Sequence, residues 1–435
     1  MRASTALGIV RDIVTRSGLR QRYWALCRFL ARVVQLARPE NRHFRRVVVR
    51  NQLLYLTNRV RPVEGEIQRR AKAAADWLAR AQDATSDDGL SLGYFPCGSD
   101  EPADRLAVTT QKRGWRPSYP ETTGYAIESL LDYADHRHDD EFRKRALRMA
   151  HWEVDIQMPS GAVQGGPVVP PERRVASVFN TGTVLQGFTA LLERERDERV
   201  LAAASRAAEF LLRDQGTDGH FQSHGAFVRS EAVKTYNCLC GWALYRFGQL
   251  TDRDACRGAA LRAVEASTRE EAANGWFRNN DLTRSDAPLL HTIAYALQGF
   301  LEVAALVGRH DWIDLVRRGT APLLDRMHSS GFLHGRYRSD WEPAGFSSCL
   351  TGNAQLAVVC YRLAAITGDE QYAAAGGRLL DFLKGLQILD SGDPGVNGAI
   401  PGSFPIFGEY MRAGYPNWAT KYFLDALFLQ ERWKA

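Results

Sequence analysis

Residues 122–135 read TTGYAIESLLDYAD, and the chain repeats this type of segment five more times. The segment starts with small polar residues and continues with glycine, alanine and large apolar residues, which predicts a largely buried helix. The other copies are NTGTVLQGFTALLE at 180–193, TYNCLCGWALYRFGQL at 235–250, LHTIAYALQGFLEVAALV at 290–307, LTGNAQLAVVCYRLAAI at 350–366 and PNWATKYFLDALFLQE at 416–431. Such self-similarity indicates one supersecondary unit that is used six times.

A second helix type, rich in alanine, arginine and glutamate, alternates with the first and is predicted to be partly exposed. Its copies lie at 65–82, 141–156, 198–214, 253–268, 310–328 and 370–386. Only a few residues lead from each buried helix to the next exposed one, whereas the return passage is long, so we expect all long connections to share one face. Most of them begin with a glycine-centred turn, at Gly89, Gly161, Gly219, Gly275, Gly331 and Gly398. Small residues would let the buried helices crowd around one axis; these are Gly124, Gly182, Gly241 and Gly352.

The predicted fold class is therefore all-α, with six helical hairpins over residues 64–435. This part of the chain resembles the (α/α)6-toroid superfamily, which includes six-hairpin glycosidases, polysaccharide lyases, uronyl C5-epimerases and sugar 2-epimerases. The segments YPETTGY, HTIAYALQGFLE, CLTGNAQLAVV and GSFPIFGEYMRAGYPNWATKYFLDALFL also resemble bacterial surface-polysaccharide biosynthesis proteins labelled prenyltransferase-like or epimerase-like. The resemblance implies a carbohydrate-active role in polysaccharide biosynthesis, although a shared fold does not determine the chemistry.

Residues 1–63 form a predicted basic arm in front of the hairpins. Residues 1–62 hold 14 arginines against Asp12 and Glu40, so the rest of the chain is net acidic although the whole carries +6. Residues 19–38 place apolar side chains on one helical face and arginines on the other. This helix is expected either to bind anionic lipid or a synthase complex at the inner membrane, or to pack on the hairpin domain. No nucleic-acid-binding motif is present, so nucleic acid is not an expected partner.

The bulk composition indicates a soluble cytoplasmic protein. Hydrophobic residues make up 45% and charged residues 24% of the chain, and the seven cysteines are scattered rather than paired. A zinc site is not expected, because Cys238 and Cys240 have no second close pair. We expect no cofactor.

The candidate site follows from the long connections, because the first turns of all six buried helices would open into one funnel. Its residues would be Glu121, Tyr125, Asn180, Tyr236, Asn237, His291, Tyr295, Asn353, Tyr415 and Asn417, joined from the connections by Trp115, Arg116, Trp276, Arg336 and Tyr410. Unpaired N–H groups at helix starts favour anions, so the expected ligand is an acidic glycan or glycan-lipid. Each asparagine could instead be an ordinary helix cap, and more than half of the aromatic rings in the connections are expected to be structural.

The leading prediction is proton abstraction beside a uronate carboxylate, as in a C5-epimerase or a lyase. In this scheme His291 and Tyr415 exchange the proton, with Tyr410 as a second tyrosine candidate, and Asn180, Asn237, Asn353 and Arg116 hold the carboxylate. Glu121 orients a hydroxyl or acts as the base, and the helix dipole is expected to lower its pKa. Glu121 could instead only stabilise the helix start, and His291 could be an ordinary buried histidine.

Two other functions stay open at this stage. A glycoside hydrolase would pair Glu121 with a second carboxylate, for which Asp281, Asp286, Glu342 and Glu409 are available. A non-catalytic polysaccharide-binding partner of a synthase would need aromatic surface without converging titratable groups. A terpene-cyclase-like function is disfavoured, because Asp87-Asp88 and Asp139-Asp140 lie in predicted turns and have no matching partner acids.

Overall fold

The computed structural model describes residues 36–57, 59–97, 113–226, 233–282 and 284–434. Thirteen α-helices and seven short strands lie in this part of the chain. The all-α class that the sequence predicts is confirmed.

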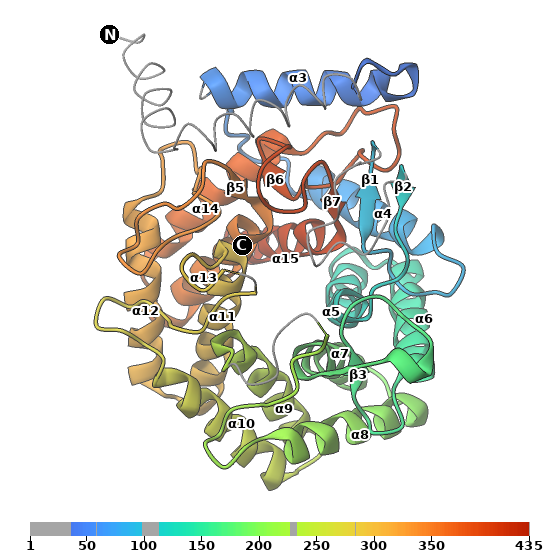
Figure 1. Cartoon of the computed structure of the whole chain (residues 1–435), viewed down its shortest axis with the longest axis vertical. Coiled ribbons are helices and arrows are strands. Elements are labelled where there is room, and N and C mark those ends of the chain that lie inside the picture. The colour runs from blue at the N-terminus through green and yellow to red at the C-terminus, as the bar shows by residue number, and fades with distance from the viewer. Residues whose placement is uncertain (1–35, 58, 98–112, 227–232, 283, 435) are drawn as a thin grey trace.

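Six inner helices surround one axis, and six outer helices surround them (Figure 1). The inner helices are α5 (Pro120–Arg137), α7 (Val178–Leu192), α9 (Cys238–Leu250), α11 (Leu290–Val307), α13 (Leu350–Thr367) and α15 (Asn417–Lys434). The outer helices are α4 (Ile67–Asp83), α6 (Asp140–Ile156), α8 (Glu198–Asp214), α10 (Asp254–Thr268), α12 (His310–Asp325) and α14 (Glu370–Leu386). Neighbouring inner helices pack on one another around the axis, and α15 contacts both α4 and α5, which closes the double ring.

Glycines allow the inner helices to approach closely. A Cβ on Gly124 would lie 2.6 Å from the Cα of Val184 on α7, and one on Gly352 would lie 2.8 Å from the backbone nitrogen of His291 on α11. Gly182 meets Cys240 of α9 in the same way. Gly241 differs from the expectation, because it faces the outer helix α10 rather than an inner neighbour.

The turn glycines connect each outer helix to the next one around the ring. Five of them adopt positive φ, and a Cβ on each would clash with a backbone carbonyl of the following outer helix. The pairs are Gly161 with Arg206, Gly219 with Arg262, Gly275 with Arg318, Gly331 with Arg378, and Gly398 with Ala73. The last pair joins α14 to α4 and so completes the circle. In the first connection Asp88, not Gly89, has the positive φ.

Glutamines at the ends of four outer helices reinforce these junctions. The Gln157 side-chain amide donates to the carbonyls of Gly161 and of Ala203 on α8, both at 2.9 Å. Three more glutamine side chains donate to two backbone carbonyls each in the same way. Gln215 donates to Gly219 and Ala259 at 2.9 and 2.8 Å, and Gln387 donates to Gly398 and Arg70 at 2.8 and 3.3 Å. Gln82 donates to Asp88 and Arg145 at 3.0 and 3.2 Å. Sequence analysis did not recognise this repeated glutamine.

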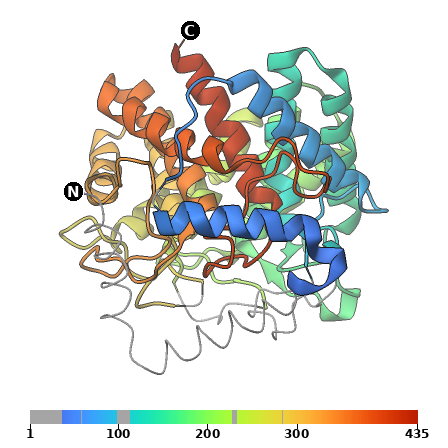
Figure 2. The same ribbon diagram turned by 90° about the horizontal axis from the view of Figure 1, so that it is seen from above.

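Seven short strands lie within the long connections. They are β1 (Gly93–Phe95), β2 (Gly114–Trp115), β3 (Val163–Gln164), β4 (Ala176–Ser177), β5 (Ser348–Cys349), β6 (Ser403–Phe404) and β7 (Tyr415–Pro416). They pair antiparallel as β2-β1-β7, β3-β4 and β5-β6. Figure 2 places the long connections at one end of the ring and the carboxyl end of α15 at the other.

The inner helices begin under a collar of backbone hydrogen bonds from these connections. The first N–H of each of five inner segments donates to a carbonyl in the next hairpin's connection. The pairs are Val178 with Ser223 (2.7 Å), Thr235 of η3 (Thr235–Asn237) with Asn279 (3.0 Å), Leu290 with Gly335 (2.9 Å), Leu350 with Gly402 (3.1 Å) and Asn417 with Leu92 (3.0 Å). The expectation that all these groups are free to bind an anion is therefore wrong for the first N–H of each segment.

The end of the basic arm forms η1 (Pro39–Asn41) and α3 (Arg42–Thr57), which lies across the outside of the ring (Figure 1). Phe44 and Val48 are buried against the connections. Most of the helix expected at 19–38 lies outside the described residues. The division at residue 63 remains a prediction.

Among the described residues, one helix, α11, is long and apolar enough to cross a membrane by length and composition. Its apolar window is 83% buried inside the protein. Burial as an inner helix of the ring accounts for this composition.

Substitution Gly331→Ala tests the close approach between outer helices. The new Cβ would occupy a left-handed φ and collide with the Arg378 carbonyl, so we expect a loss of about 3 kcal/mol or more in unfolding free energy. Gly368→Ala is the matched control, because Gly368 has a similar positive φ with open space around it and should cost about 1 kcal/mol. Equal losses in denaturant unfolding would show that the contact contributes nothing.

Candidate functional site

Glu121 is held near the start of α5 but does not cap it. Pro120 occupies the first helical position, and the Thr123 hydroxyl accepts from the Leu90 N–H and donates to the Tyr119 carbonyl, both at 2.9 Å. Thr123 therefore fixes the helix start to its connection. The partly exposed Glu121 carboxylate forms no hydrogen bond or ion pair with any described residue. It is available for a ligand.

Burial raises the pKa of Glu121 to about 7. This is the opposite of the expected depression by the helix dipole, because desolvation of the carboxylate dominates. A carboxyl group with this pKa can accept and donate a proton near neutral pH.

Tyrosines from several elements surround Glu121. Burial raises the pKa of Tyr119, Tyr125, Tyr236, Tyr295 and Tyr410, and the nearby Glu121 charge raises each of them further. They come from α5 and its start, from η3, from α11 and from the connection before β7. The ring closure thus brings phenol groups from distant parts of the sequence within electrostatic reach of one carboxylate.

His291 is buried beside two of these tyrosines. Its ring centroid lies 4.5 Å from that of Tyr295 and 5.5 Å from that of Tyr410. Its Nδ1 lies 2.7 Å from Oε1 of Gln355 on α13, and burial lowers its pKa to about 4. The imidazole is therefore neutral, and with the Gln355 oxygen facing Nδ1, the Nε2 atom is left as a proton acceptor.

Tyr410 is positioned as a hydroxyl donor. Its oxygen accepts a hydrogen bond of 2.9 Å from Nε1 of Trp418, and its backbone N–H donates to the Ser403 hydroxyl at 3.0 Å. The phenolic hydrogen therefore remains available to a substrate. The hydroxyls of Tyr125 and Tyr295 are buried and interact with each other, so further phenol groups lie beside Glu121.

Tyr415 lies elsewhere. It belongs to β7 and pairs with Tyr94 of β1, and burial followed by the charge of Asp393 raises its pKa, whereas Glu121 is not among the main causes. The expected proton exchange between His291 and Tyr415 is thus not favoured by the geometry. Tyr410 is the tyrosine that stands beside His291.

Three of the predicted asparagines hold the connections instead of a ligand. The side-chain amide of Asn180 donates to Gln164 at 2.9 Å, that of Asn353 to Gly331 at 3.3 Å, and that of Asn417 to Ser91 at 2.8 Å. Asn237 contacts His224 at 3.3 Å, and its Oδ1 is buried without a partner. Among the described residues, the Oδ1 atom of Asn417 likewise has no hydrogen-bond partner.

The other predicted binding residues pack within the connections. Trp115 lies against Trp77 and Tyr94 with ring centroids 5.2 and 5.1 Å apart. The Arg116 guanidinium lies 4.5 Å from the Phe95 ring centroid, Trp276 packs on Trp341 at 5.0 Å, and Arg336 donates to the Ala287 carbonyl at 2.8 Å. These contacts fit the alternative expectation that most rings in the connections are structural.

The carboxylates that could complete a hydrolase pair lie beside cations. Asp281 faces Lys234 at 3.4 Å, Asp286 faces Arg284 at 2.8 Å and Glu342 faces Arg326 at 3.7 Å. Burial raises the pKa of Glu409, and Arg336 and two further arginines oppose that shift. Asp281 comes nearest to the cluster, since its charge and that of Glu121 both act on Tyr236.

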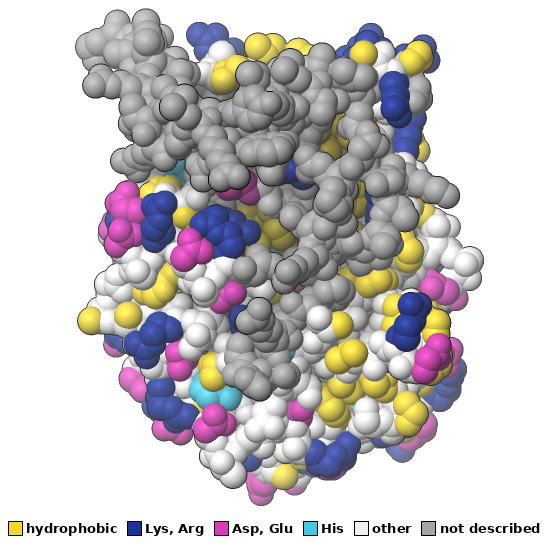
Figure 3. Space-filling model, in the orientation of Figure 1, with side chains coloured by type: hydrophobic (Ala, Val, Ile, Leu, Met, Phe, Trp, Pro, Cys, Tyr) yellow, Lys and Arg dark blue, Asp and Glu magenta, His cyan; other side chains and the backbone are white. Residues whose placement is uncertain are grey.

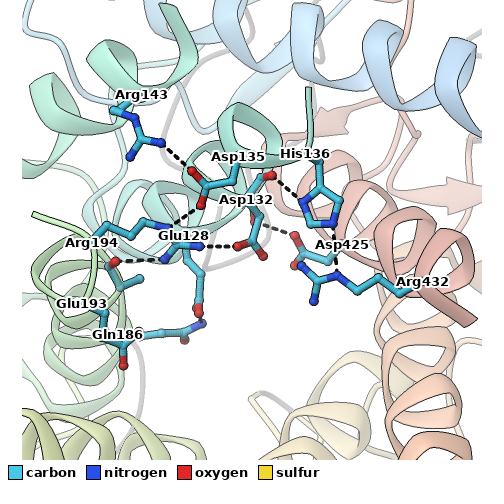
Figure 4. Close-up of polar contacts among 12 residues, drawn as sticks. Glu128, Asp132, Asp135, His136, Arg143, Gln186, Glu193, Arg194, Asp425 and Arg432 are labelled. Carbon is cyan, nitrogen blue, oxygen red and sulfur yellow. Dashed lines mark hydrogen bonds and ion pairs between the residues drawn. The ribbon is translucent and has the colours of Figure 1, made fainter. Parts of the chain in front are cut away.

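A charged network lies on the inner helices along the axis (Figure 4). Glu128 accepts from Gln186 at 2.6 Å and from Arg246 at 2.8 Å, and Asp425 accepts from Ser129 at 2.6 Å. Lys421 joins this network to the tyrosines, because its ammonium pairs with Asp425 at 2.7 Å and lies over the rings of Tyr125 and Tyr422 at 4.8 and 4.1 Å. Sequence analysis missed Lys421, Tyr422, Gln355 and Trp418, although all four stand in the predicted inner helices.

Among the described residues, no group of three or more histidine, cysteine, aspartate or glutamate side chains could hold a metal ion. The site consists of a carboxyl group, a neutral imidazole and phenols.

Comparison with solved structures identifies the architecture. An unsaturated glucuronyl hydrolase from a Bacillus species has a TM-score of 0.62 at 18% identity and covers 84% of this chain and 97% of its own. The cellobiose 2-epimerase of Bacillus thermoamylovorans has a TM-score of 0.64 at 12% identity and covers 84% of this chain and 98% of its own. The chain folds as an (α/α)6 toroid.

An unsaturated glucuronyl hydrolase specific for heparin also shares the toroid, with a TM-score of 0.63, 14% identity, and coverage of 85% of this chain and 97% of its own. No family model matches the sequence, and no curated protein is similar to it. At these identities the likeness establishes the fold, while the chemistry depends on the site.

Substitution Glu121→Gln tests the raised pKa of this carboxyl group through the stability of the protein. Unfolded glutamate titrates near 4.5 and native Glu121 near 7, so the native state holds an extra proton between these values. The unfolding free energy should therefore fall as pH rises through this window and stay low above it. At about pH 8 the glutamine variant should be more stable than wild type by on the order of 2 kcal/mol, with a smaller gain at about pH 5.

Thermal unfolding of both proteins across this pH range measures the effect. A difference between them that does not change with pH would mean that Glu121 titrates as an ordinary surface carboxyl.

Proposed function

We propose that the toroid is an enzyme that acts on an acidic oligosaccharide or polysaccharide by proton transfer at a sugar carbon, as in uronate C5-epimerisation or elimination. The observation that supports this most directly is Glu121, a carboxyl with a pKa of about 7 whose charge acts on Tyr410, the tyrosine that packs against the neutral His291. General bases work best when their pKa lies close to the working pH.

The proposed reaction begins when Glu121 or His291 removes the proton on the carbon next to the uronate carboxylate. In epimerisation, Tyr410 returns a proton to the opposite face of that carbon. In elimination, the glycosidic oxygen leaves with a proton from the same hydroxyl, and a carbon–carbon double bond forms. The buried hydroxyls of Tyr125 and Tyr295, which the Glu121 charge also reaches, can donate to the developing negative charge.

Aromatic rings beside the cluster support a sugar ligand. Phe179 packs on Tyr236 and Tyr295 with ring centroids 5.2 and 4.8 Å apart, and Trp418 lies 6.2 Å from Tyr119. Aromatic rings together with a few polar groups that fix orientation are typical of small-molecule sites. The role in bacterial surface-polysaccharide biosynthesis remains a prediction from the sequence.

Glycoside hydrolysis is the second candidate. A carboxyl group with a pKa of about 7 can protonate a leaving group, and the fold is shared with unsaturated glucuronyl hydrolases. The cation beside each of the other candidate carboxylates counts against a hydrolytic pair. A binding module alone would not need the convergence of Glu121, His291 and Tyr410.

Incubation with a panel of uronate-containing polysaccharides distinguishes these reactions. We expect either ultraviolet absorbance from a new double bond, which reports elimination, or deuterium uptake from heavy water at the carbon next to the carboxylate, which reports epimerisation. The Glu121→Gln variant should lose the signal. New reducing ends without either signal would show hydrolysis instead, and no reaction with any uronate polymer would contradict the proposal.

Tyrosine-to-phenylalanine variants test which hydroxyl moves the proton. On the substrate found in that panel, Tyr410→Phe should lower kcat by about a hundredfold or more, the usual contribution of a positioned acid or base. Tyr415→Phe is the matched control, because it removes a buried hydroxyl without a partner outside the cluster and should leave kcat nearly unchanged. A larger loss in the Tyr415 variant would restore the assignment made from the sequence.

A further inference from the structure

The helix α3 is fixed to the toroid by one face. Phe44 packs on Phe407 with ring centroids 6.3 Å apart, and the Asn51 side chain accepts the Ile406 N–H at 2.6 Å. The Tyr55 hydroxyl donates to the Phe346 carbonyl at 2.9 Å. These contacts spread over the length of the helix, so its other face is held outward in one orientation.

That outward face carries a row of exposed aliphatic side chains. Val49, Leu53 and Leu56 are 57, 56 and 51% exposed, more than any other large hydrophobic residue in the described part of the chain. They follow one another at helical spacing and therefore form one stripe. Single exposed aliphatic residues are ordinary, but a contiguous stripe on a fixed helix indicates an interaction surface.

Arginines surround the stripe. An open hollow of about 970 Å³ runs along this face, lined by Arg42, Arg45, Arg46, Val49, Arg50, Leu53, Leu54, Thr57, Arg59 and Arg61. Among the residues whose side chains the structure describes, this lining contains no acidic residue, and Arg45, Arg46 and Arg50 form no ion pair. Basic and hydrophobic side chains gather along the upper edge in Figure 3, where α3 lies. The positive charge of this surface favours an anionic partner.

We propose that this face of α3 docks on the anionic surface of a lipid bilayer. The side chains of this face match the two outer layers of such a bilayer. The aliphatic side chains can insert among the acyl chains, and the guanidinium groups around them can pair with the lipid phosphates. A soluble polyanion would engage the arginines but would gain little from the leucines. The exposed stripe therefore favours the bilayer over an anionic polymer.

The helix that carries the docking surface lies against a connection that also carries a residue of the candidate site. α3 contacts Phe404, Ile406 and Phe407, in the same connection that carries Tyr410. A bilayer bound to α3 would lie along the outer side of the ring, next to this connection. The proposal does not depend on the reaction at Glu121, because it rests on α3 alone.

Vesicle binding by the full chain tests the proposal. Protein is mixed with vesicles of phosphatidylcholine alone or of phosphatidylcholine with phosphatidylglycerol, and the bound fraction is measured by sedimentation at low and high salt. We expect binding to the anionic vesicles only, weakened by salt. The double variants Leu53→Ser with Leu56→Ser, and Arg45→Gln with Arg46→Gln, should each lose about tenfold or more in affinity.

The control is Leu250→Ser with Leu306→Ser, which changes exposed leucines on α9 and α11 and should bind as wild type. Circular dichroism melts confirm folding of all variants, and the arginine pair gives an independent test if a leucine variant unfolds. Equal binding to neutral vesicles would overturn the proposal. Wild-type binding by the α3 leucine variant would also overturn it, because charge alone, or the residues before α3, would then carry the interaction.

Discussion

The close approach between each glycine turn and the carbonyl of the next outer helix is the constraint on which the toroid depends. At Gly161, Gly219, Gly275, Gly331 and Gly398 there is no room for a side chain. At four of the six places where consecutive outer helices meet, a glutamine side chain also donates to a carbonyl of the turn and to a carbonyl of the neighbouring outer helix. Since Gly398 meets Ala73, the twelve helices close on themselves, and the six inner helices must begin at the same end.

Closure creates both the site and its electrostatics. The inner helices crowd until Gly124 and Gly352 touch their neighbours' backbones, and this packing leaves Glu121 largely desolvated. Desolvation explains why the pKa of Glu121 rises and that of His291 falls, so His291 is neutral at physiological pH and Glu121 titrates close to it. On the axis, the Lys421 ammonium is balanced by Asp425 and by two tyrosine faces.

The collar around the site uses most of the polar groups at the helix starts. Asn180, Asn353 and Asn417 bind backbone carbonyls of the connections, because a loop folded over helix ends would otherwise leave buried N–H and C=O groups unpaired. Glu121 and the Tyr410 hydroxyl hydrogen are not used in this way and can meet a ligand. The same connections also support α3 through Phe407 and Ile406.

The sequence by itself determined the helices, their alternation and the glycine turns, because helix periodicity and positive φ are local properties that composition reveals. It also placed Glu121, His291 and Tyr410 among the candidates. Only the tertiary structure separated Tyr410 from Tyr415, because the fold packs Tyr410 against His291 and pairs Tyr415 with Tyr94, although only four residues lie between them. The direction of the Glu121 pKa shift likewise depended on burial by segments far away in the chain, which no local pattern encodes.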